Sequence, residues 1–219
     1  MTKLKNMDFK AAIFDLDGTL FDSMWFWNGI DERFLASRGI DDVPEDYLLA
    51  IAHLGAKETA VYTKERFGLS ESPEEMMQEW YDEALAFYRN DVRFKPGAYE
   101  YVKKLHDRGV KLAVATASQH DLFMPALERL GAADFFSAFA TVNECGKIKE
   151  FPDIYELACR KLGATASETV VFEDIYAAIC GAKSGGFYTV AVYDSVSGRD
   201  MAKIREKADL FITGFEELL

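Results

Sequence analysis

The segment AAIFDLDGTLFDS, residues 11–23, limits the possible folds of this chain more than any other. It begins with a run of apolar residues that has the composition of a strand buried on both faces. Asp15 and Asp17 follow this run directly, with Gly18 and Thr19 behind them. Such a pattern occurs in tight turns, where Asp side chains bond to the backbone, and also in reaction centres that need paired carboxylates. The rest of the sequence has to distinguish these two interpretations.

Apolar, strand-like runs recur along the chain, and segments with helical periodicity lie between them. The expected strands cover residues 10–14, 111–116, 138–142, 169–173, 188–192 and 209–212. The expected helices between them cover residues 97–107, 119–130, 152–162 and 177–184. Strands that alternate with helices pair in parallel, and nearly continuous apolar strands require helices on both faces of their sheet. The pattern therefore predicts an α/β fold with a doubly wound, Rossmann-like parallel sheet.

One interval interrupts this alternation, because we find no convincing strand between about residues 23 and 91. Amphipathic helical segments fill it instead, at residues 25–38, 44–51, 57–67 and 73–89. The last of them starts with a predicted capping box, in which Ser72 is the N-cap and Glu75 its partner. We therefore expect a core domain of residues 1–21 and 93–219, with an α-helical cap domain, residues 22–92, inserted after the first strand.

Charge and composition restrict the partners of the chain. The net charge is −12, and residues 22–92 hold 6 Lys and Arg against 16 Asp and Glu. The sequence has no basic stripe of the kind that binds nucleic acid, and an acidic segment repels polyanions. We therefore expect a small substrate.

The three cysteines form no metal or disulfide pattern. With no signal peptide and no apolar run long enough to span a membrane, we expect a cytoplasmic monomer or homodimer without a membrane partner.

Polar side chains follow several expected strands where those strands end. Ligands of open parallel sheets bind at the carboxyl ends of strands, so these groups should converge on one edge. The converging groups are Asp15, Asp17, Thr116, Glu173 and Asp174, together with Lys147 or Lys149 from the loop at residues 143–153. Crowded carboxylates favour a hard cation such as Mg²⁺, and a lysine and a hydroxyl beside it would neutralise a phosphoryl group.

These residues resemble the motifs of the haloacid dehalogenase superfamily, in the right order and over nearly the whole core. The sequence DLDGTL, residues 15–20, is similar to the first motif, and Thr116 stands where the second has Ser or Thr. Lys149, in KEFPDIY, matches the lysine of the third motif, and Glu173-Asp174, in VVFED, match the acidic fourth. The insertion point and helical content resemble the cap class that includes β-phosphoglucomutase and many small phosphatases.

The resemblance implies a Mg²⁺-dependent phosphatase that hydrolyses a small phosphorylated metabolite, such as a sugar phosphate, through an aspartyl-phosphate intermediate. Asp15 would be the nucleophile, and Asp17 the general acid and base. Thr116 and the backbone of Ala117 would hold the phosphoryl group. Lys149 would stabilise charge on Asp15 and on the phosphate.

The implied metal site uses residues of the first and the fourth motif. Asp15 and Asp174 would be Mg²⁺ ligands, joined by the backbone carbonyl of Asp17. Glu173 would be either a further ligand or a partner of the ligands, and the resemblance leaves both open.

Substrate specificity would come from the cap. The candidates for its inner surface are Trp25, Phe26, Trp27, His53 and Lys57. β-Phosphoglucomutase carries a catalytic His where this chain has Trp27, which argues against a mutase or phosphotransferase. Lys57 leaves open a phosphonoacetaldehyde hydrolase-like enzyme, in which a cap lysine forms a Schiff base. A non-catalytic module that binds a phosphorylated ligand is the third alternative.

Overall fold

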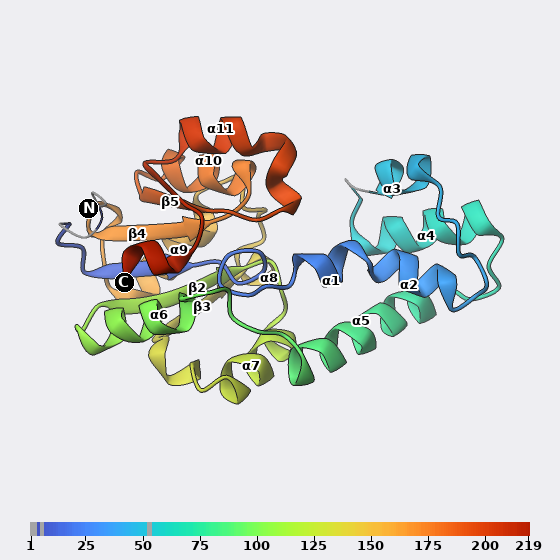
Figure 1. Ribbon diagram of the computed structural model, residues 1–219, viewed down its shortest axis with the longest axis horizontal. Coiled ribbons are helices and arrows are strands. Elements are labelled where there is room, and N and C mark those ends of the chain that lie inside the picture. The colour runs from blue at the N-terminus through green and yellow to red at the C-terminus, as the bar shows by residue number, and fades with distance from the viewer. Residues whose placement is uncertain (1–3, 5–6, 52–53) are drawn as a thin grey trace. The chain divides into compact units, whose positions relative to one another are not determined.

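The computed structural model describes residue 4, residues 7–51 and residues 54–219 (Figure 1). The chain forms two compact units. The first, the sheet unit, consists of Met1–Met24 and Val92–Leu219, and the second, the helical unit, of Trp25–Asp91. Identification of these units with a catalytic core and a cap remains a proposal.

The sheet unit is built around six parallel strands. They are β1 (Ala11–Phe14), β2 (Lys111–Thr116), β3 (Ala138–Thr141), β4 (Thr169–Glu173), β5 (Tyr188–Val192) and β6 (Leu210–Ile212). Their order is β3-β2-β1-β4-β5-β6, so β1 lies between β2 and β4. The register pairs Phe14 with both Val114 and Phe172. The predicted doubly wound parallel sheet is confirmed, and the point where the strand order reverses lies beside β1.

Every residue of β1 is buried, because helices cover both faces of the sheet (Figure 1). On one face, Ala11 and Ile13 belong to an apolar cluster that includes residues of α9 (Asp153–Leu162). On the other face, Phe14 stacks on Phe172 with ring centroids 4.4 Å apart, and Phe215 packs beside them. A strand with two buried faces needs apolar residues at successive positions, which explains the uninterrupted run before Asp15.

The other helices of the sheet unit connect successive strands. They are α6 (Ala98–Asp107), α7 (His120–Arg129), α8 (Val142–Cys145), α10 (Tyr176–Ser184) and α11 (Met201–Lys207). The sequence did not predict α8 and α11, which are four and seven residues long. In the part of the chain that the structure describes, no helix has the length and apolar character needed to cross a membrane.

The helical unit contains no strand among its described residues. Its helices are α1 (Met24–Asn28, whose first residue belongs to the sheet unit), α2 (Ile30–Ala36), α3 (Glu45–Ile51), α4 (Ala56–Phe67) and α5 (Pro73–Asn90). The expected single helix at residues 25–38 is wrong, because Gly29 separates α1 from α2. Glycine is among the least favourable residues inside a helix, which makes it a natural point of interruption.

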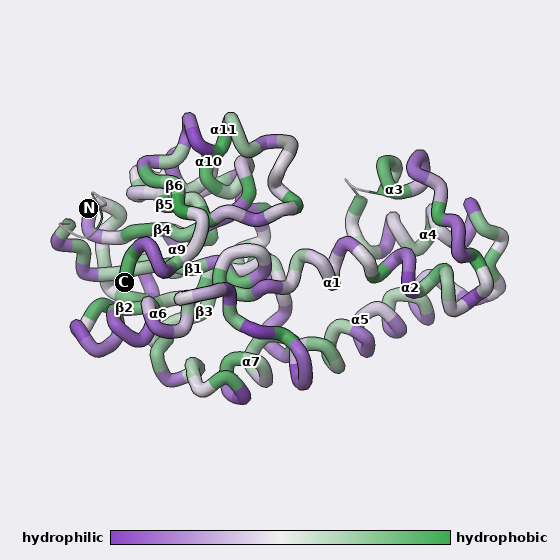
Figure 2. The backbone as a smooth tube through the Cα atoms, in the orientation of Figure 1, coloured by the Kyte–Doolittle hydropathy of each residue, from purple (hydrophilic) through white to green (hydrophobic). Residues whose placement is uncertain are grey.

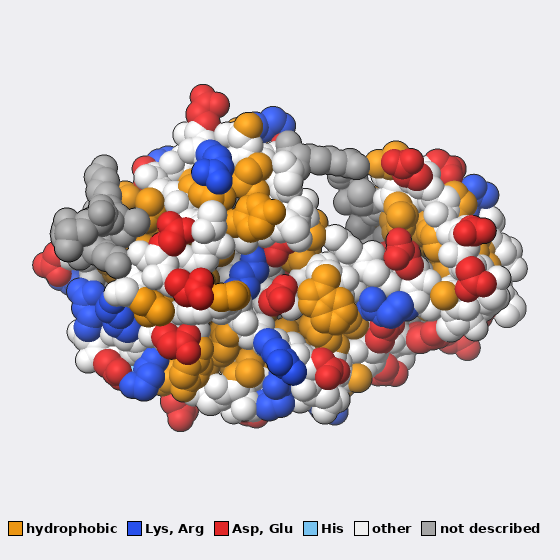
Figure 3. Space-filling model, viewed as in Figure 1, with side chains coloured by type: hydrophobic (Ala, Val, Ile, Leu, Met, Phe, Trp, Pro, Cys, Tyr) orange, Lys and Arg blue, Asp and Glu red, His pale blue; other side chains and the backbone are white. Residues whose placement is uncertain are grey.

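The packing of the helical unit follows its sequence pattern. Phe26 of α1 stacks on Phe87 of α5 with ring centroids 4.1 Å apart, and hydrophobic and hydrophilic residues alternate along α5 (Figure 2). The predicted capping box at the start of α5 is confirmed, since Ser72 and Glu75 bond reciprocally. Acidic side chains are numerous on the visible face of this unit (Figure 3).

Candidate active site

The turn after β1 places its residues by a set of short backbone hydrogen bonds. The Asp15 amide donates to the carbonyl of Phe172 at 3.1 Å, which extends the pairing of β1 with β4. The amides of Thr19 and Phe21 then donate to the carbonyl of Leu16 at 3.2 and 2.7 Å, which closes a tight turn. A tight turn therefore follows β1, and this turn holds Asp15 at the carboxyl edge of the sheet.

Gly18 is required at its position in this turn for two reasons. Its φ of +79° is a conformation that residues with a side chain rarely adopt. A Cβ at this position would also lie 2.4 Å from Oδ2 of Asp174. The next residue fixes the same carboxylate, because the Thr19 hydroxyl donates to Asp174 Oδ1 at 3.0 Å. The turn after β1 thus positions a side chain that follows β4.

Three buried carboxylates meet at this edge. One carboxylate oxygen from each of Asp15, Glu173 and Asp174 lies within 4.8 Å of the others. The Lys149 ammonium lies 2.5 Å from Asp15 Oδ1 and 2.7 Å from Glu173 Oε1, and it is itself 8% exposed. If all three carboxylates were ionised, the single ammonium would leave a net of two negative charges in a site shielded from water.

Burial governs the protonation of this cluster. Loss of water raises the pKa of Asp15 well above its usual range, although the Lys149 ammonium opposes the rise. Burial, reinforced by the neighbouring Glu173 carboxylate, raises the pKa of Asp174 to about 7. Burial alone would lower the pKa of Lys149, but Asp15 and Glu173 hold it above the usual value. These raised pKa values show that Lys149 alone does not compensate three ionised carboxylates, so full ionisation of the cluster requires a further positive charge.

The donor set fits a divalent cation with a preference for oxygen. Oε2 of Glu173 is buried and has no hydrogen-bond partner among the described residues. An unpaired buried carboxylate oxygen is costly, so it indicates a group that compensates it. Three carboxylates in one place are the ligand type that Mg²⁺ prefers. Asp15, Asp174 and Glu173 could therefore hold such an ion.

Asp17 lies outside this carboxylate cluster and has its own partners. Ser23 donates to its Oδ1 at 2.7 Å, and Ser118 donates to its Oδ2 at 2.6 Å. The Ser118 amide also donates to the buried hydroxyl oxygen of Thr116 at 3.0 Å, while the neighbouring Ala117 is exposed. Thr116 and Asp17 are thus linked through Ser118. The sequence did not predict either serine, because a serine in a loop after a strand is too common to be a signal.

The structure distinguishes the two lysines of the loop before α9. Lys149 is buried between Asp15 and Glu173, whereas Lys147 is half-exposed and pairs with Asp153 at 2.8 Å. Only Lys149 of the two reaches the carboxylate cluster. The sequence analysis also missed Tyr155, whose hydroxyl donates to Glu173 Oε1 at 2.9 Å. Tyr155 lies in the same motif as Lys149, but an aromatic residue near a helix start normally indicates only core packing.

The remaining predicted residues belong to the helical unit. Trp27 is half-buried, and its Nε1 donates to the Tyr88 hydroxyl at 3.3 Å. Trp25 is 60% exposed, whereas Phe26 is buried. The part of these aromatic residues in substrate recognition stays a prediction, and His53 lies outside the described residues.

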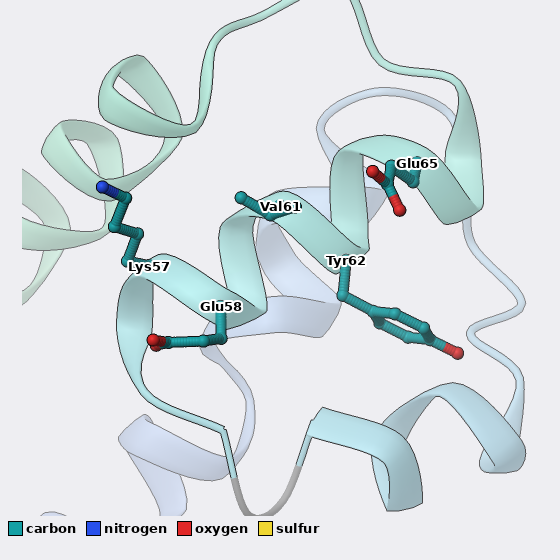
Figure 4. A pocket seen from close by; sticks show the side chains of 5 residues that line it. All are labelled: Lys57, Glu58, Val61, Tyr62 and Glu65. Atoms are coloured by element: carbon teal, nitrogen blue, oxygen red, sulfur yellow. The ribbon is translucent and has the colours of Figure 1, made fainter.

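Lys57 lies in the first turn of α4 and lines a shallow surface pocket of about 340 Å³ (Figure 4). The other residues that line this pocket are Glu58, Val61, Tyr62 and Glu65. Two carboxylates therefore accompany a single ammonium. Within its own unit this pocket does not favour a phosphate group, so the substrate role of Lys57 stays a prediction.

Comparison with known proteins finds relatives both by sequence and by structure. Pyrophosphatase PpaX of Halalkalibacterium halodurans is 28% identical over 210 residues, which cover 90% of this chain and 89% of that protein. A phosphorylated carbohydrates phosphatase of Thermotoga maritima is 26% identical over 81% of this chain and 82% of its own length. The crystal structure of CbbY from Rhodobacter sphaeroides in complex with xylulose-(1,5)bisphosphate shares the fold, with a TM-score of 0.77, 22% identity and 96% of each chain covered.

The family model agrees with the motifs that the sequence analysis identified. It describes haloacid dehalogenase-like hydrolases and matches residues 12–192, a range that begins within β1 and ends with β5. All the residues of the carboxylate cluster, together with Lys149, fall inside the matched range. This chain therefore belongs to the haloacid dehalogenase-like hydrolases.

Proposed function

We propose that this protein is a Mg²⁺-dependent phosphatase that hydrolyses a small phosphorylated metabolite of the sugar phosphate type. The observation that carries this proposal is the placement of Lys149 between Asp15 and Glu173, beside Asp174, at the carboxyl edge of the sheet. An ammonium next to a nucleophilic carboxylate is what transfer of a phosphoryl group requires, because such transfer depends on positioning and charge stabilisation. In this proposal residues 1–21 and 93–219 are the catalytic core, and residues 22–92 are the cap.

The metal site of this proposal consists of Asp15, Asp174 and Glu173, with the backbone carbonyl of Asp17. Mg²⁺ bound there would offset the charge of the carboxylates and of a phosphate oxygen. The remaining chemistry belongs to the side chains of the chain itself.

In the first half of the reaction a carboxylate oxygen of Asp15 attacks phosphorus, and the bond from phosphorus to the leaving oxygen breaks. Lys149 stabilises the charge on the transferred group. The hydroxyl of Thr116 and the amide of Ala117 orient the group's other oxygens. Asp17 donates a proton to the leaving oxygen.

In the second half, Asp17 takes a proton from water, and that water attacks the aspartyl-phosphate at phosphorus. Phosphate leaves and the carboxylate of Asp15 is restored. The hydrogen bonds from Ser23 and Ser118 account for both oxygens of Asp17 in the structure. They hold its carboxylate in one orientation, and each oxygen keeps a further lone pair through which Asp17 can take or give a proton.

The substrate class rests on relatives and on charge. Two of the relatives that are more than 25% identical over most of this chain are named as a pyrophosphatase and as a phosphatase of phosphorylated carbohydrates. Residues 22–92 carry a net charge of −10, from 6 basic and 16 acidic residues, which opposes binding of polyanions. The charge and the carbohydrate phosphatase favour a small monoester, whereas the named pyrophosphatase keeps pyrophosphate among the compounds to be tested.

The test is phosphate release from a panel of sugar phosphates, nucleotides, pyrophosphate and phosphonates, with Mg²⁺ and with EDTA. We expect release from one class of monoester in Mg²⁺ only. Asp15→Asn should abolish turnover, because an amide is a poor nucleophile. Asp8→Asn, the same change at an exposed position before β1, is the control and should leave the rate unchanged. Turnover that survives Asp15→Asn contradicts the proposed nucleophile.

The alternative activities make different predictions in the same panel. A mutase would isomerise a sugar phosphate faster than it releases phosphate, and the presence of Trp27 in place of His argues against it. A phosphonoacetaldehyde hydrolase would be trapped by borohydride through Lys57, which is exposed within its unit, whereas Schiff-base chemistry needs a desolvated amine. A non-catalytic binding module would release no phosphate from any compound.

A further inference from the structure

Tyr155 is a buried tyrosine whose ring packs among apolar residues and whose hydroxyl makes a polar contact. It lies in the first turn of α9, is 0% exposed, and belongs to the apolar cluster that also includes Ala11, Ile13 and Val171. Its hydroxyl donates to Glu173 Oε1 at 2.9 Å. Phenylalanine would fill the same apolar space, so the packing of the ring does not explain the hydroxyl.

The two carboxylate oxygens of Glu173 are treated unequally. Oε1 accepts from both Lys149, at 2.7 Å, and Tyr155, at 2.9 Å. Oε2 is equally buried and accepts from no described group. Two donors from different elements on the same oxygen fix the orientation of the carboxylate and leave the second oxygen available.

The two donors differ in what else they bind. Lys149 is shared with Asp15, 2.5 Å away, and in the proposed reaction it also contacts the phosphoryl group. Among the described residues, the Tyr155 hydroxyl has a hydrogen bond to Glu173 alone. Tyr155 can therefore hold Glu173 in place while Lys149 moves with the reacting charge.

We propose that Tyr155 is a positioning residue. Its hydroxyl fixes Oε1 of Glu173 so that Oε2 serves as a direct ligand of the cation held by Asp15 and Asp174. Of the two roles that the family resemblance left open for Glu173, this selects the ligand. The inference rests on the cation site of the proposed function, but not on turnover.

The test compares Tyr155→Phe with Tyr188→Phe. Tyr188 offers a matched control because its hydroxyl, like that of Tyr155, is buried. Unlike the Tyr155 hydroxyl, it has no hydrogen-bond partner within the described residues. The register pairs Tyr188 with Val170, three residues before Glu173, which places it roughly 10 Å along the strand at about 3.3 Å per residue. Both changes remove one buried phenol hydroxyl from the sheet unit and keep the ring.

The measurement is the dissociation constant of Mg²⁺ from each protein, by isothermal titration calorimetry without substrate. We expect Tyr155→Phe to weaken Mg²⁺ binding by about 10-fold, as is typical when a group that orients a metal ligand is removed. Tyr188→Phe should bind as the wild type does. The rise in unfolding temperature with Mg²⁺ provides a second readout, since a ligand stabilises the native state according to its affinity. The substrate KM of Tyr155→Phe should change less than the Mg²⁺ concentration for half-maximal rate.

Equal Mg²⁺ affinity in Tyr155→Phe and the wild type would overturn the inference. An equal loss in both variants would also overturn it, because it would show a general loosening of the core. A wild-type protein that binds no Mg²⁺ overturns both the inference and the proposed cofactor. If Mg²⁺ binds as expected but no compound is hydrolysed, only the proposed function fails.

Discussion

At the scale of single residues, the site depends on positions that only one type of residue fits. Gly18 has a positive φ, and an added Cβ would meet the carboxylate of Asp174, which Thr19 already holds. Two separate costs therefore oppose any side chain there. The first is backbone strain, of about 1–2 kcal/mol, and the second is displacement of Asp174.

We expect Gly18→Ala to lower kcat/KM by at least about 10-fold, because Asp174 must move away from the other carboxylates. Gly131→Ala is the matched control. Its φ is +68°, but no described atom lies within 4 Å of the added Cβ. Steady-state kinetics and thermal unfolding of both variants separate the two costs. Both should lose stability, and only Gly18→Ala should lose activity. Equal activity in the two variants would show that contact with Asp174 is unimportant.

The residues that the sequence could predict share one property: each is a polar side chain at the end of a strand or in the loop after it. Asp15, Thr116 and Asp174 are of this kind, and parallel topology alone brings them to one edge. Ser118 and Tyr155 could not be predicted in the same way. Their contacts depend on rotamers and on how α9 packs against the sheet, which no short pattern encodes. The catalytic roles of all these residues stay predictions.

At the scale of elements, α5 shows how local chemistry fixes a helix start. The Ser72 hydroxyl accepts from the Glu75 amide, and the Glu75 side chain accepts from the Ser72 amide. We expect Ser72→Ala to lower the unfolding free energy by about 1 kcal/mol, measured by urea denaturation. Ser70→Ala, in the same loop, removes only an exposed bond to Glu71 and is the control. Equal losses would show that the cap bond itself contributes little.

The same capping box should give the helical unit a defined dependence on pH. Hydrogen bonds from the amide and hydroxyl of Ser72 lower the pKa of Glu75 below its usual value of 4.5. A lowered pKa in the folded state stabilises the fold above pH 4.5, and this contribution is lost as the pH falls through the folded value. Glu75→Gln keeps an acceptor but no charge. The gap in unfolding temperature between wild type and Glu75→Gln should therefore narrow from pH 7 to pH 3, and a constant gap would exclude this linkage.

Element boundaries were predictable for the strands and failed where a single glycine divides a helical pattern. The central strands β1 and β4 follow runs that topology buries on both faces, so sequence and structure agree on them. Residues 25–38 carry a continuous helical pattern, yet Gly29 divides them into α1 and α2. Periodicity indicates which face of a helix is buried, whereas a single glycine can determine whether the helix continues.

At the scale of the whole molecule, a buried ion pair joins distant parts of the sheet unit. Lys95 lies just after the helical unit in sequence, and its ammonium lies 2.8 Å from Asp194 Oδ2, in the loop after β5. The two side chains are 10% and 6% exposed, and Lys95 also donates to the carbonyl of Tyr193. The pair fixes the point where the chain returns from the helical unit to the edge of the sheet.

We expect Lys95→Met to destabilise the protein by about 3–5 kcal/mol, because it leaves a buried carboxylate without its partner. The double variant Lys95→Met with Asp194→Leu should recover much of this loss, since it removes both charges. Lys183, half-exposed and paired with Asp209, supplies the control: Lys183→Met should cost at most about 1 kcal/mol. Denaturant unfolding of the four proteins measures these values. A double variant as unstable as Lys95→Met would mean that packing, not charge, explains the loss.

The carboxylate cluster should make metal binding and folding depend on each other across the sheet unit. Without a cation, three buried carboxylates repel one another, and Lys149 compensates only part of their charge. Asp174→Asn should therefore raise the unfolding free energy in EDTA, because it removes one repelling charge.

In Mg²⁺ at about 100 times its dissociation constant, the wild type should gain about 2.7 kcal/mol, whereas Asp174→Asn should gain much less, because it lacks a ligand. Asp8→Asn, outside the cluster, should behave as the wild type in both conditions. The expected result is a reversal: the variant is the more stable protein in EDTA and the less stable one in Mg²⁺. If Asp174→Asn is less stable than the wild type in both EDTA and Mg²⁺, Asp174 stabilises the fold through its hydrogen bond with Thr19. Its charge would then not destabilise the metal-free protein.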